Sequence, residues 1–434
     1  MTERSYNRRV VAAWSLYDFA NSAFTTLVVT FIYATYFTKG IAENEVVGTE
    51  LWSRAVALSA ISVALLSPYI GAIADRGGYR KRFLLVSTLV CIVGTIVLYF
   101  GGPGEVLFAL TWFVISDIAF EMGNVFYNAY LPDIAPSDRI GRISGYGWAL
   151  GYVGGLLCLF VGYFILVAPE TPPFGLSAET GEHVRATNLL VAVWFGVFSI
   201  PAFLFLREEK PLDPPRIGLI LRSATRQLIN TFNEIRTFKD IFWLLFARLI
   251  YNDGLVTIFA FGGIYAQGSF GFSTGDIFIF AIALNLAAGL GAYLFGFLDD
   301  RIGGKVTVLI SLVFLTIAAL VAVTTRSTIL FWIAAVVVGL CAGPNQSASR
   351  SLMGRFVPAT NENEFYGFFA FSGKATAFMS PLLLGWLTGV FDSQRAGMAS
   401  VMMFFVLGGL VLLKVNESRG ATQAGRDRTI PLPR

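Results

Sequence analysis

Long apolar runs dominate this sequence and rule out an ordinary water-soluble fold. Hydrophobic residues make up 55% of the chain and charged residues 14%, and the mean hydropathy is +0.67. A helix needs about 20 apolar residues to cross the hydrocarbon of a bilayer, and about twelve runs of that length follow one another. The alternating pattern of an outer-membrane barrel is absent. We therefore predict an all-α protein of about twelve transmembrane helices embedded in the lipid bilayer.

The predicted spans are Val11–Phe37, Leu51–Ile73, Phe83–Gly101, Val106–Leu131, Ile143–Val167, Asn188–Leu206, Ile241–Ala266, Ile277–Leu298, Val306–Thr324, Thr328–Met353, Tyr366–Val390 and Met398–Leu413. The first run is too long for a signal-peptide core, so we expect it to be retained. About 24 of the 32 Lys and Arg fall on the side of the two termini, which the positive-inside rule assigns to the cytoplasm. We expect a protein of the plasma (inner) membrane, with both termini cytoplasmic.

Motifs of enzymatic or metal chemistry are missing from the sequence. Cys91, Cys158 and Cys341 all fall inside predicted spans, without disulfide or metal-ligand spacing. Neither a phosphate-binding GxxxxGK[ST] loop nor an HExxH site occurs. We therefore expect no metal, no cofactor, no nucleic-acid partner and no enzymatic activity, and we expect a monomer.

The longest polar segment divides the chain nearly in half. It runs from Arg207 to Asp240, between the sixth and seventh spans. Its pattern favours an amphipathic helix on the inner membrane surface, with Ile217, Ile220, Leu221, Leu228, Phe232 and Ile235 on one face. The predicted domains are residues 1–206 and 240–434, each a six-helix bundle, joined by a cytoplasmic linker over residues 207–239.

The two halves carry related sequences. GAIADRGGYRKR, at residues 71–82, recurs as GFLDDRIGGKV at residues 296–306. Asp75 and Asp300 therefore occupy matching positions, each at the cytoplasmic end of the second span of its half. Two halves of the same orientation indicate parallel repeats about an axis normal to the membrane, with a solute site between them.

These loops resemble the signature loop of the major facilitator superfamily, and the twelve-span layout agrees over nearly the whole chain. The opening AWSLYDFANSAF, residues 13–24, resembles the "unknown major facilitator" branch, which is related to fungal autophagy-associated vacuolar effluxers. The resemblance implies that spans one, four, seven and ten line a central cavity and that span eleven borders it. It also implies that the loop residues Asp75, Arg76, Arg80, Asp300 and Arg301 control the conformational switch at the cytoplasmic side.

Charges inside the spans are few, and a charge in the membrane interior indicates function because burying it costs about 2.5 to 3.5 kcal/mol. All of them fall on spans that the resemblance sends inward. They are Asp18 on span one, Asp117 and Glu121 on span four, Arg248 and Asp253 on span seven, Arg350 on span ten, and Lys374 on span eleven.

Spacing and depth divide these residues into two groups. Asp117, Glu121, Asn124 and Asn128 follow one another at helical spacing and share a face of span four. Together with Asp253, Lys374, Asn345 and Gln346, they form the predicted solute and coupling site near the middle of the membrane. Asp18, Asn21, Arg248 and Arg350 lie closer to the cytoplasm, so we predict that they form a gate in which Asp18 pairs with Arg248 or Arg350. The opposite charges can equally serve only to lock helices together.

We predict a secondary transporter of a small solute that works by alternating access. The fungal relatives imply amino-acid efflux, and Glu121 or Asp117 is the expected carrier of a coupling proton. One alternative is drug or metabolite antiport with protons, whose fifth-span glycine pattern is kept by Gly147, Gly151, Gly154 and Gly155, although Tyr152 replaces its proline. An alternative of another class is a non-transporting membrane sensor on the same fold.

Overall fold

The computed structural model describes residues 7–208, 223, 225–226 and 238–425. All regular secondary structure in these described residues is helical, as the sequence predicts. The predicted amphipathic face of the linker, residues 217–235, lies outside the described residues except for isolated positions.

The first half of the chain forms six spans. Their elements are α1 (Arg8–Ala23), η1 (Phe24–Phe31), α2 (Tyr33–Tyr36), η2 (Phe37–Ile41), α3 (Glu45–Gly77), α4 (Arg80–Leu98), α5 (Val106–Ala129), α6 (Leu131–Ile134), α7 (Ile140–Gly162), η3 (Tyr163–Val167), η4 (Pro173–Gly175) and α8 (Glu182–Phe205). We call this group the N-bundle.

The second half forms six further spans and a short terminal helix. Its elements are α10 (Lys239–Phe270), α11 (Thr274–Ile302), α12 (Gly304–Thr324), α13 (Thr328–Phe356), α14 (Glu362–Lys374), α15 (Met379–Phe391), α16 (Gln394–Leu412) and α17 (Glu417–Gln423). We call this group the C-bundle.

Ten helices of the described residues are long and apolar enough to cross a membrane. The other two predicted spans, the first and the eleventh, are discontinuous. In span one the α-helix ends at Ala23 and continues as the π-helix η1, and in span eleven the chain unwinds between Lys374 and Met379. The pair Gly343-Pro344 is expected from sequence to break or kink a helix; a break is wrong, because α13 continues through that proline. Gly343 lies so close to α11 that a Cβ atom there would be 2.0 Å from the Ala288 carbonyl oxygen, and this packing supports the helix where the proline weakens it.

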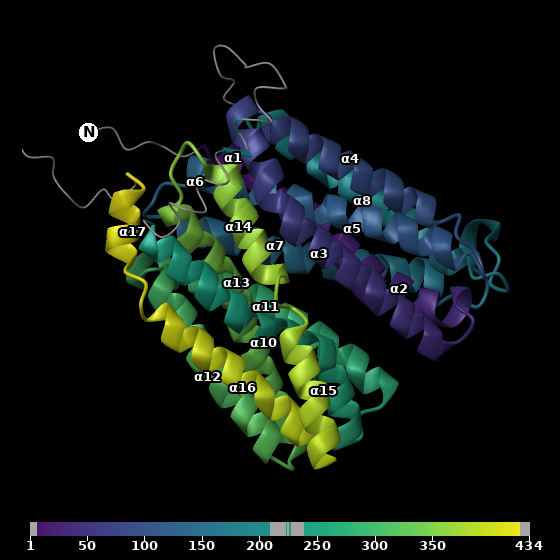
Figure 1. Cartoon of the computed structure of the whole chain (residues 1–434). Helices are drawn as coiled ribbons and strands as arrows, with labels where there is room; N and C mark the ends of the chain where they lie inside the picture. The colour runs from purple at the N-terminus through teal and green to yellow at the C-terminus, as the bar shows by residue number, and fades with distance from the viewer. Residues whose placement is uncertain (1–6, 209–222, 224, 227–237, 426–434) are drawn as a thin grey trace, which may run out of the picture.

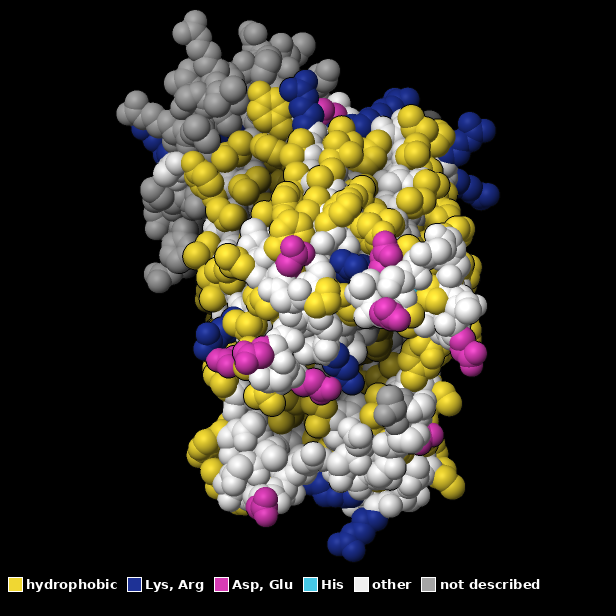
Figure 2. Space-filling view, turned by 90° about the vertical axis from the view of Figure 1, so that its right-hand side faces the viewer, with side chains coloured by type: hydrophobic (Ala, Val, Ile, Leu, Met, Phe, Trp, Pro, Cys, Tyr) yellow, Lys and Arg dark blue, Asp and Glu magenta, His cyan; other side chains and the backbone are white. Residues whose placement is uncertain are grey.

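Each bundle encloses a hydrophobic core of its own. The bundles meet through two helix pairs, α3 with α14 and α7 with α11, and Figure 1 shows them diverging toward α2 and α15. We call the end that carries α6, α17 and the start of α14 the closed end. Figure 2 shows the molecule from the right-hand side of Figure 1. On this side the surface is hollowed between its upper and lower parts, and charged side chains lie beside the hollow.

The two helix pairs differ in how far along their length the partner helices stay in contact. Tyr163, in η3, lies 5.6 Å from Phe278 of α11 between ring centroids, so α7 and its continuation follow α11 far from the closed end. In contrast, α15 packs mainly on its own neighbours α16 and α10. The hollow therefore opens on the side where α3 faces α15.

Candidate functional site

Arg350 of α13 joins the two bundles near the closed end. Its Nη1 donates to Asp18 Oδ2 at 3.0 Å and to Asn128 Oδ1 at 3.1 Å, and its Nε donates to Ser144 Oγ at 2.9 Å. Only 3% of the Arg350 side chain is exposed. Asp18 therefore pairs with Arg350, one of the two bases that the sequence offers it.

Arg248, the other base, has no carboxylate partner in the described residues. Its Nη1 donates to the Phe369 carbonyl oxygen at 2.6 Å and to Ser372 Oγ at 3.0 Å. Its guanidinium carbon lies 3.7 Å from the centre of the Phe369 ring. These contacts are within the C-bundle, so Arg248 links α10 to α14 and does not cross between the bundles.

Glu121 and Lys374 form the second ion pair between the bundles. Lys374 Nζ lies 2.7 Å from Glu121 Oε1, and the side chains are 33% and 19% exposed. Lys374 is the last residue of α14, at the break in span eleven. Asp117, one turn along α5, accepts a 2.5 Å hydrogen bond from Ser59 of α3. The pair is thus partly exposed, whereas the neighbouring Asp117 is buried.

The polar stripe of α5 contacts four different helices. Besides Asp117 and Glu121, Asn124 Oδ1 accepts a 3.0 Å hydrogen bond from Asn21 of α1, and Asn128 contacts Arg350 of α13. The predicted common face therefore exists, and it holds α3, α14, α1 and α13 together.

The remaining predicted site residues lie in the C-bundle. Asp253 is buried and accepts a 3.1 Å hydrogen bond from Thr376, in the break of span eleven. Gln346 Nε2 donates to Asn252 Oδ1 at 3.3 Å. Asn345 instead donates to Ser311 of α12 at 2.9 Å, so its side chain points away from the bundle interface.

Asp75 caps a helix of the opposite bundle. Its carboxylate accepts hydrogen bonds from the main-chain N–H groups of Asn363, at 3.1 Å, and Glu364, at 2.8 Å, in the first turn of α14. The free N–H groups at a helix N-terminus favour a negative charge. Asp75 of the first bundle therefore holds the N-terminus of a helix of the second bundle.

Asp300 has the matching contacts in the other helix pair. It accepts hydrogen bonds from the N–H groups of Gly141, at 2.8 Å, and Arg142, at 3.3 Å, in the first turn of α7. The Arg142 side chain also pairs with it. The two repeated loops therefore fasten the bundles at both helix pairs by the same device.

Arg80 is the loop arginine with contacts in both bundles. It pairs at 2.5 Å with Asp133 of α6 and at 2.5 Å with Glu362 of α14. Arg76 and Arg301 are exposed.

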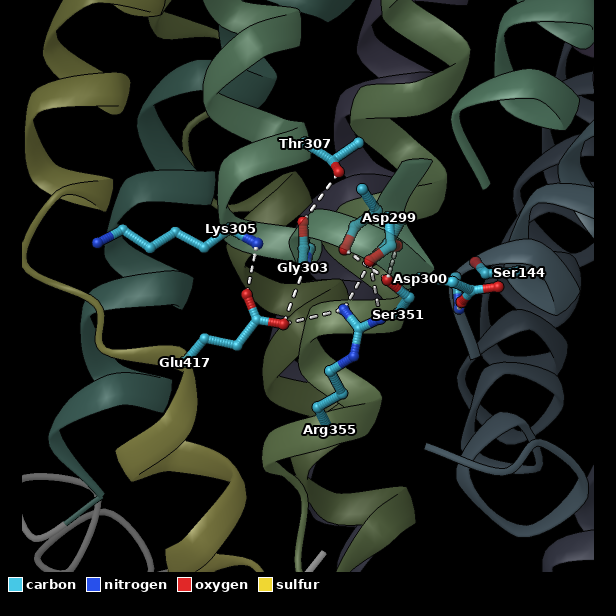
Figure 3. A network of polar contacts seen from close by, with 12 residues as sticks. Ser144, Asp299, Asp300, Gly303, Lys305, Thr307, Ser351, Arg355 and Glu417 are labelled. Carbon is cyan, nitrogen blue, oxygen red and sulfur yellow. Dashed lines mark hydrogen bonds and ion pairs between the residues drawn. The ribbon is translucent and has the colours of Figure 1, made fainter. Parts of the chain in front are cut away.

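A further network of polar contacts at the closed end includes the terminal helix α17 (Figure 3). Arg355 Nη1 pairs with Asp299 at 2.7 Å and with Glu417 at 3.1 Å. Glu417 also accepts hydrogen bonds from the N–H groups of Gly304 and Lys305, at 3.1 Å and 3.0 Å, and so caps α12. Gly303 (φ +90°) leaves room for this carboxylate, because a Cβ atom there would lie 2.7 Å from Glu417 Oε2.

The same terminal segment is fastened to the start of α10. Arg419 Nε donates to Asp240 Oδ2 at 2.7 Å, and this hydrogen bond raises the pKa of Arg419 above its usual value. The network thus joins α10, α11, α12 and α13 to α17 within the C-bundle.

Some functional positions carried no sequence signal of their own. Ser59, Ser144 and Thr376 are small polar residues in apolar runs, where such residues are common. Trp148 reads as an ordinary apolar residue, yet its ring lies 5.6 Å from the Arg350 guanidinium carbon. Helical spacing places Trp14 on the same face of span one as Asp18, but only the crossing of the helices brings its ring to 4.8 Å from that carbon.

Comparison with known proteins finds relatives over most of this chain. A family model described as "Vacuole effluxer Atg22 like" matches residues 51–425. The uncharacterized MFS-type transporter YxiO of Bacillus subtilis (strain 168) is 28% identical over 97% of this chain and 98% of its own. Autophagy-related protein 22 of Yarrowia lipolytica is 22% identical over 86% of this chain and 76% of its own.

Solved structures agree on the fold. The proton:xylose symporter XylE superposes with a TM-score of 0.74 at 14% identity, covering 96% of this chain and 98% of its own. The human organic anion transporter MFSD10 gives a TM-score of 0.72 at 15% identity, covering 93% of this chain and 99% of its own. At these identities the likeness concerns the fold alone, which is that of the major facilitator superfamily.

Proposed function

Because the chain belongs to the Atg22-like vacuole effluxer family and has the major facilitator fold, we propose that it exports amino acids by alternating access, coupled to protons. The chain is thus an integral membrane transporter of the major facilitator type, and the proposal adds the solute, the direction and the driving ion.

The Glu121–Lys374 ion pair is the observation that carries the choice of solute. It joins the bundles at the break in span eleven, and both side chains are partly exposed. A zwitterion can replace the pair charge for charge, since its ammonium group suits Glu121 and its carboxylate suits Lys374. Without such a replacement, separating the pair would leave two uncompensated charges in the membrane.

Proton coupling is proposed for the same carboxylates. A proton on Glu121 neutralises it and weakens its attraction to Lys374, so protonation and release of the pair are linked. Asp117 lies one turn away on α5 and has Ser59 as its hydrogen-bond partner. The charge of Arg248 also acts on Glu121 and Lys374, so two acids face two bases, and a proton on either acid leaves an uncompensated base that can hold a solute carboxylate.

The proposed motion is a rocking of the N-bundle against the C-bundle. The contacts of Asp18, Asp75, Arg80 and Asp300 would break and re-form at the closed end. We place that end in the cytoplasm and the chain in the plasma membrane, since about 24 of 32 Lys and Arg favour this orientation. The structure then corresponds to the outward-open stage of the cycle.

Flux through proteoliposomes tests the proposal. The purified protein is reconstituted, and entry of a panel of labelled amino acids, dipeptides, sugars and organic cations is measured with and without an imposed pH gradient, against protein-free liposomes. The expected result is amino-acid flux that rises with the gradient. Flux of none of these solutes would overturn transport, and flux of sugars or drug-like cations alone would overturn the amino-acid assignment.

A further inference from the structure

Arg350 is a C-bundle residue whose side chain, among the described residues, makes all its hydrogen bonds with the N-bundle. Its fork of N–H groups reaches Asp18 on α1, Asn128 on α5 and Ser144 on α7, and Nη2 donates to the Ser144 carbonyl oxygen at 2.7 Å. These acceptors surround the plane of the guanidinium. The arrangement suits a planar donor of several N–H groups better than a round ammonium group.

Three aromatic rings complete the enclosure, and they too belong to the N-bundle. The Arg350 guanidinium carbon lies 4.8 Å from the ring of Trp14, 5.7 Å from that of Tyr127 and 5.6 Å from that of Trp148. Aromatic faces attract cations at such distances. We call the set Trp14, Asp18, Tyr127, Asn128, Ser144 and Trp148 the guanidinium socket.

Contacts inside the N-bundle hold the socket in shape. Trp14 Nε1 donates to the Tyr127 carbonyl oxygen at 3.0 Å, and the two rings stack at 4.6 Å. Tyr17 stacks on the other side of Tyr127 at 4.9 Å, and its hydroxyl lies 2.7 Å from Thr88 Oγ1. None of these contacts needs the C-bundle, so the socket persists when Arg350 leaves.

One glycine provides the room for the cation. A Cβ atom at Gly147 would lie 2.5 Å from Asp18 Oδ2, 2.7 Å from Arg350 Nη2 and 3.0 Å from the Trp14 ring. Any larger residue at this position would therefore fill the space that the guanidinium occupies.

From these contacts we propose that the guanidinium socket is a binding site for the guanidinium group of a transported solute, such as arginine or agmatine. The inference rests on the proposed alternating access. When the bundles separate at the closed end, α13 withdraws Arg350, and Asp18 is left as a carboxylate without a cation among aromatic rings. A solute guanidinium restores the charge balance and the hydrogen bonds, so its binding stabilises the separated state.

Removing the built-in occupant gives the direct test. In Arg350→Ala the socket keeps its rings and its carboxylate but has lost its cation. Millimolar agmatine or arginine should raise the unfolding midpoint of this variant by at least about 2 °C. Citrulline has nearly the shape of arginine but a neutral urea group, so it can bind only as a zwitterion at the Glu121–Lys374 pair and should raise the midpoint less than arginine does. Equal effects of arginine and citrulline, or no effect of either, would overturn the socket.

Two variants serve as controls for this experiment. In the double variant Asp18→Asn, Arg350→Ala the carboxylate is also gone, so the response to agmatine should fall at least about tenfold in apparent affinity. The guanidinium of Arg395 lies over the Phe270 ring and donates to the carbonyl oxygens of Val323 and Thr325. Arg395→Ala removes it. Since no carboxylate contacts Arg395 in the described part of the chain and Arg350 stays in place, this variant should respond to agmatine no more than the unmodified protein. A response as large as that of Arg350→Ala would count against the socket.

A second measurement applies whether or not Arg350→Ala folds. Binding of labelled arginine to the unmodified protein in nanodiscs should be displaced more strongly by agmatine than by citrulline, and Gly147→Leu should weaken it at least about tenfold. Absence of binding, or binding that Gly147→Leu leaves intact, refutes the inference. If other amino acids still cross proteoliposomes, that refutation leaves the proposed transport in place, whereas arginine binding without any flux would overturn transport and keep the site.

Discussion

Lys374 Nζ lies 2.7 Å from Glu121 Oε1, and this contact joins the two bundles at the one place where span eleven is unwound. The α-helix is replaced there by turns that keep hydrogen bonds from Ala377 N to Lys374 O and from Met379 N to Thr376 O, and broken helices of this kind line transport sites in other membrane proteins. We propose that a solute exchanges places with protein contacts at this ion pair and helix break.

Replacing Glu121 with glutamine tests its proposed role as proton carrier. Glu121→Gln keeps the shape of the side chain but cannot ionise, so we expect gradient-driven accumulation to be lost while solute exchange across the membrane is partly retained. Proton-driven and exchange flux are measured on the same proteoliposomes. Glu50→Gln is the matched control, since Glu50 also pairs with a base but is exposed on α3. Unchanged dependence on the pH gradient would remove Glu121 from coupling.

Asp75 should act on conformation as well as on stability. Asp75→Ala removes the cap of α14 and should lower the free energy of unfolding by about 1 kcal/mol. It also removes a contact between the bundles, so the closed end should open more often. Asn44→Ala is the control, because Asn44 caps α3 within one bundle. Both variants should lose similar stability, and only Asp75→Ala should speed maleimide labelling of a Ser67→Cys reporter, whose site is buried between α3 and α14.

Close approach of α3 to α14 makes Gly71 intolerant of a side chain. A Cβ atom there would lie 2.4 Å from the Asn363 carbonyl oxygen, whereas one at Gly385 meets nothing within 4 Å. Overpacking costs about 1 to 3 kcal/mol, so Gly71→Ala should reduce the ratio of closed to open molecules roughly tenfold. Gly385→Ala should behave like the parent. The same Ser67→Cys reporter measures both, and equal labelling in the two variants would contradict the packing argument.

Glu417 should stabilise the C-bundle without affecting solute affinity. Glu417→Ala removes the cap of α12 and one partner of Arg355, so we expect a loss of about 1 to 2 kcal/mol in the free energy of unfolding. Thermal unfolding followed in detergent measures the loss, and the apparent KM of amino-acid flux should stay within about twofold. A large rise in KM would place the α17 network in the solute path.

The sequence predicted the fold and the charged residues of the bundle interface, but not which of them pair. Helical spacing places Asp117, Glu121, Asn124 and Asn128 on one face, because that follows from the geometry of a single helix. Whether Asp18 meets Arg248 or Arg350 depends on how α10 and α13 cross α1, and spacing along one helix carries no such information. Opposite charges therefore indicated an interface without fixing its contacts.

The helix breaks were the least predictable feature. Pro344 suggested a break, yet α13 is continuous and packs tightly at Gly343. Span eleven unwinds at Ala375–Phe378, between Gly373 and Pro381, and a proline there cannot donate to the Ala377 carbonyl oxygen. The same residue type thus ends a helix in span eleven and is tolerated in α13, where tertiary contacts outweigh local propensity. The roles of Arg76, Arg301 and Asn345 in transport stay predictions.

Distances between spin labels across the two ends of the bundles test alternating access most directly. After replacement of the three buried cysteines, one pair, Ser53→Cys and Asp392→Cys, reports on the open end, and a second pair, Arg9→Cys and Arg301→Cys, reports on the closed end. All four positions are exposed. With amino acid present in a pH gradient, the first distance should shorten in the population in which the second lengthens. If each of the two spin-label distances kept one unchanged value, or if both lengthened in the same population, the account would be contradicted.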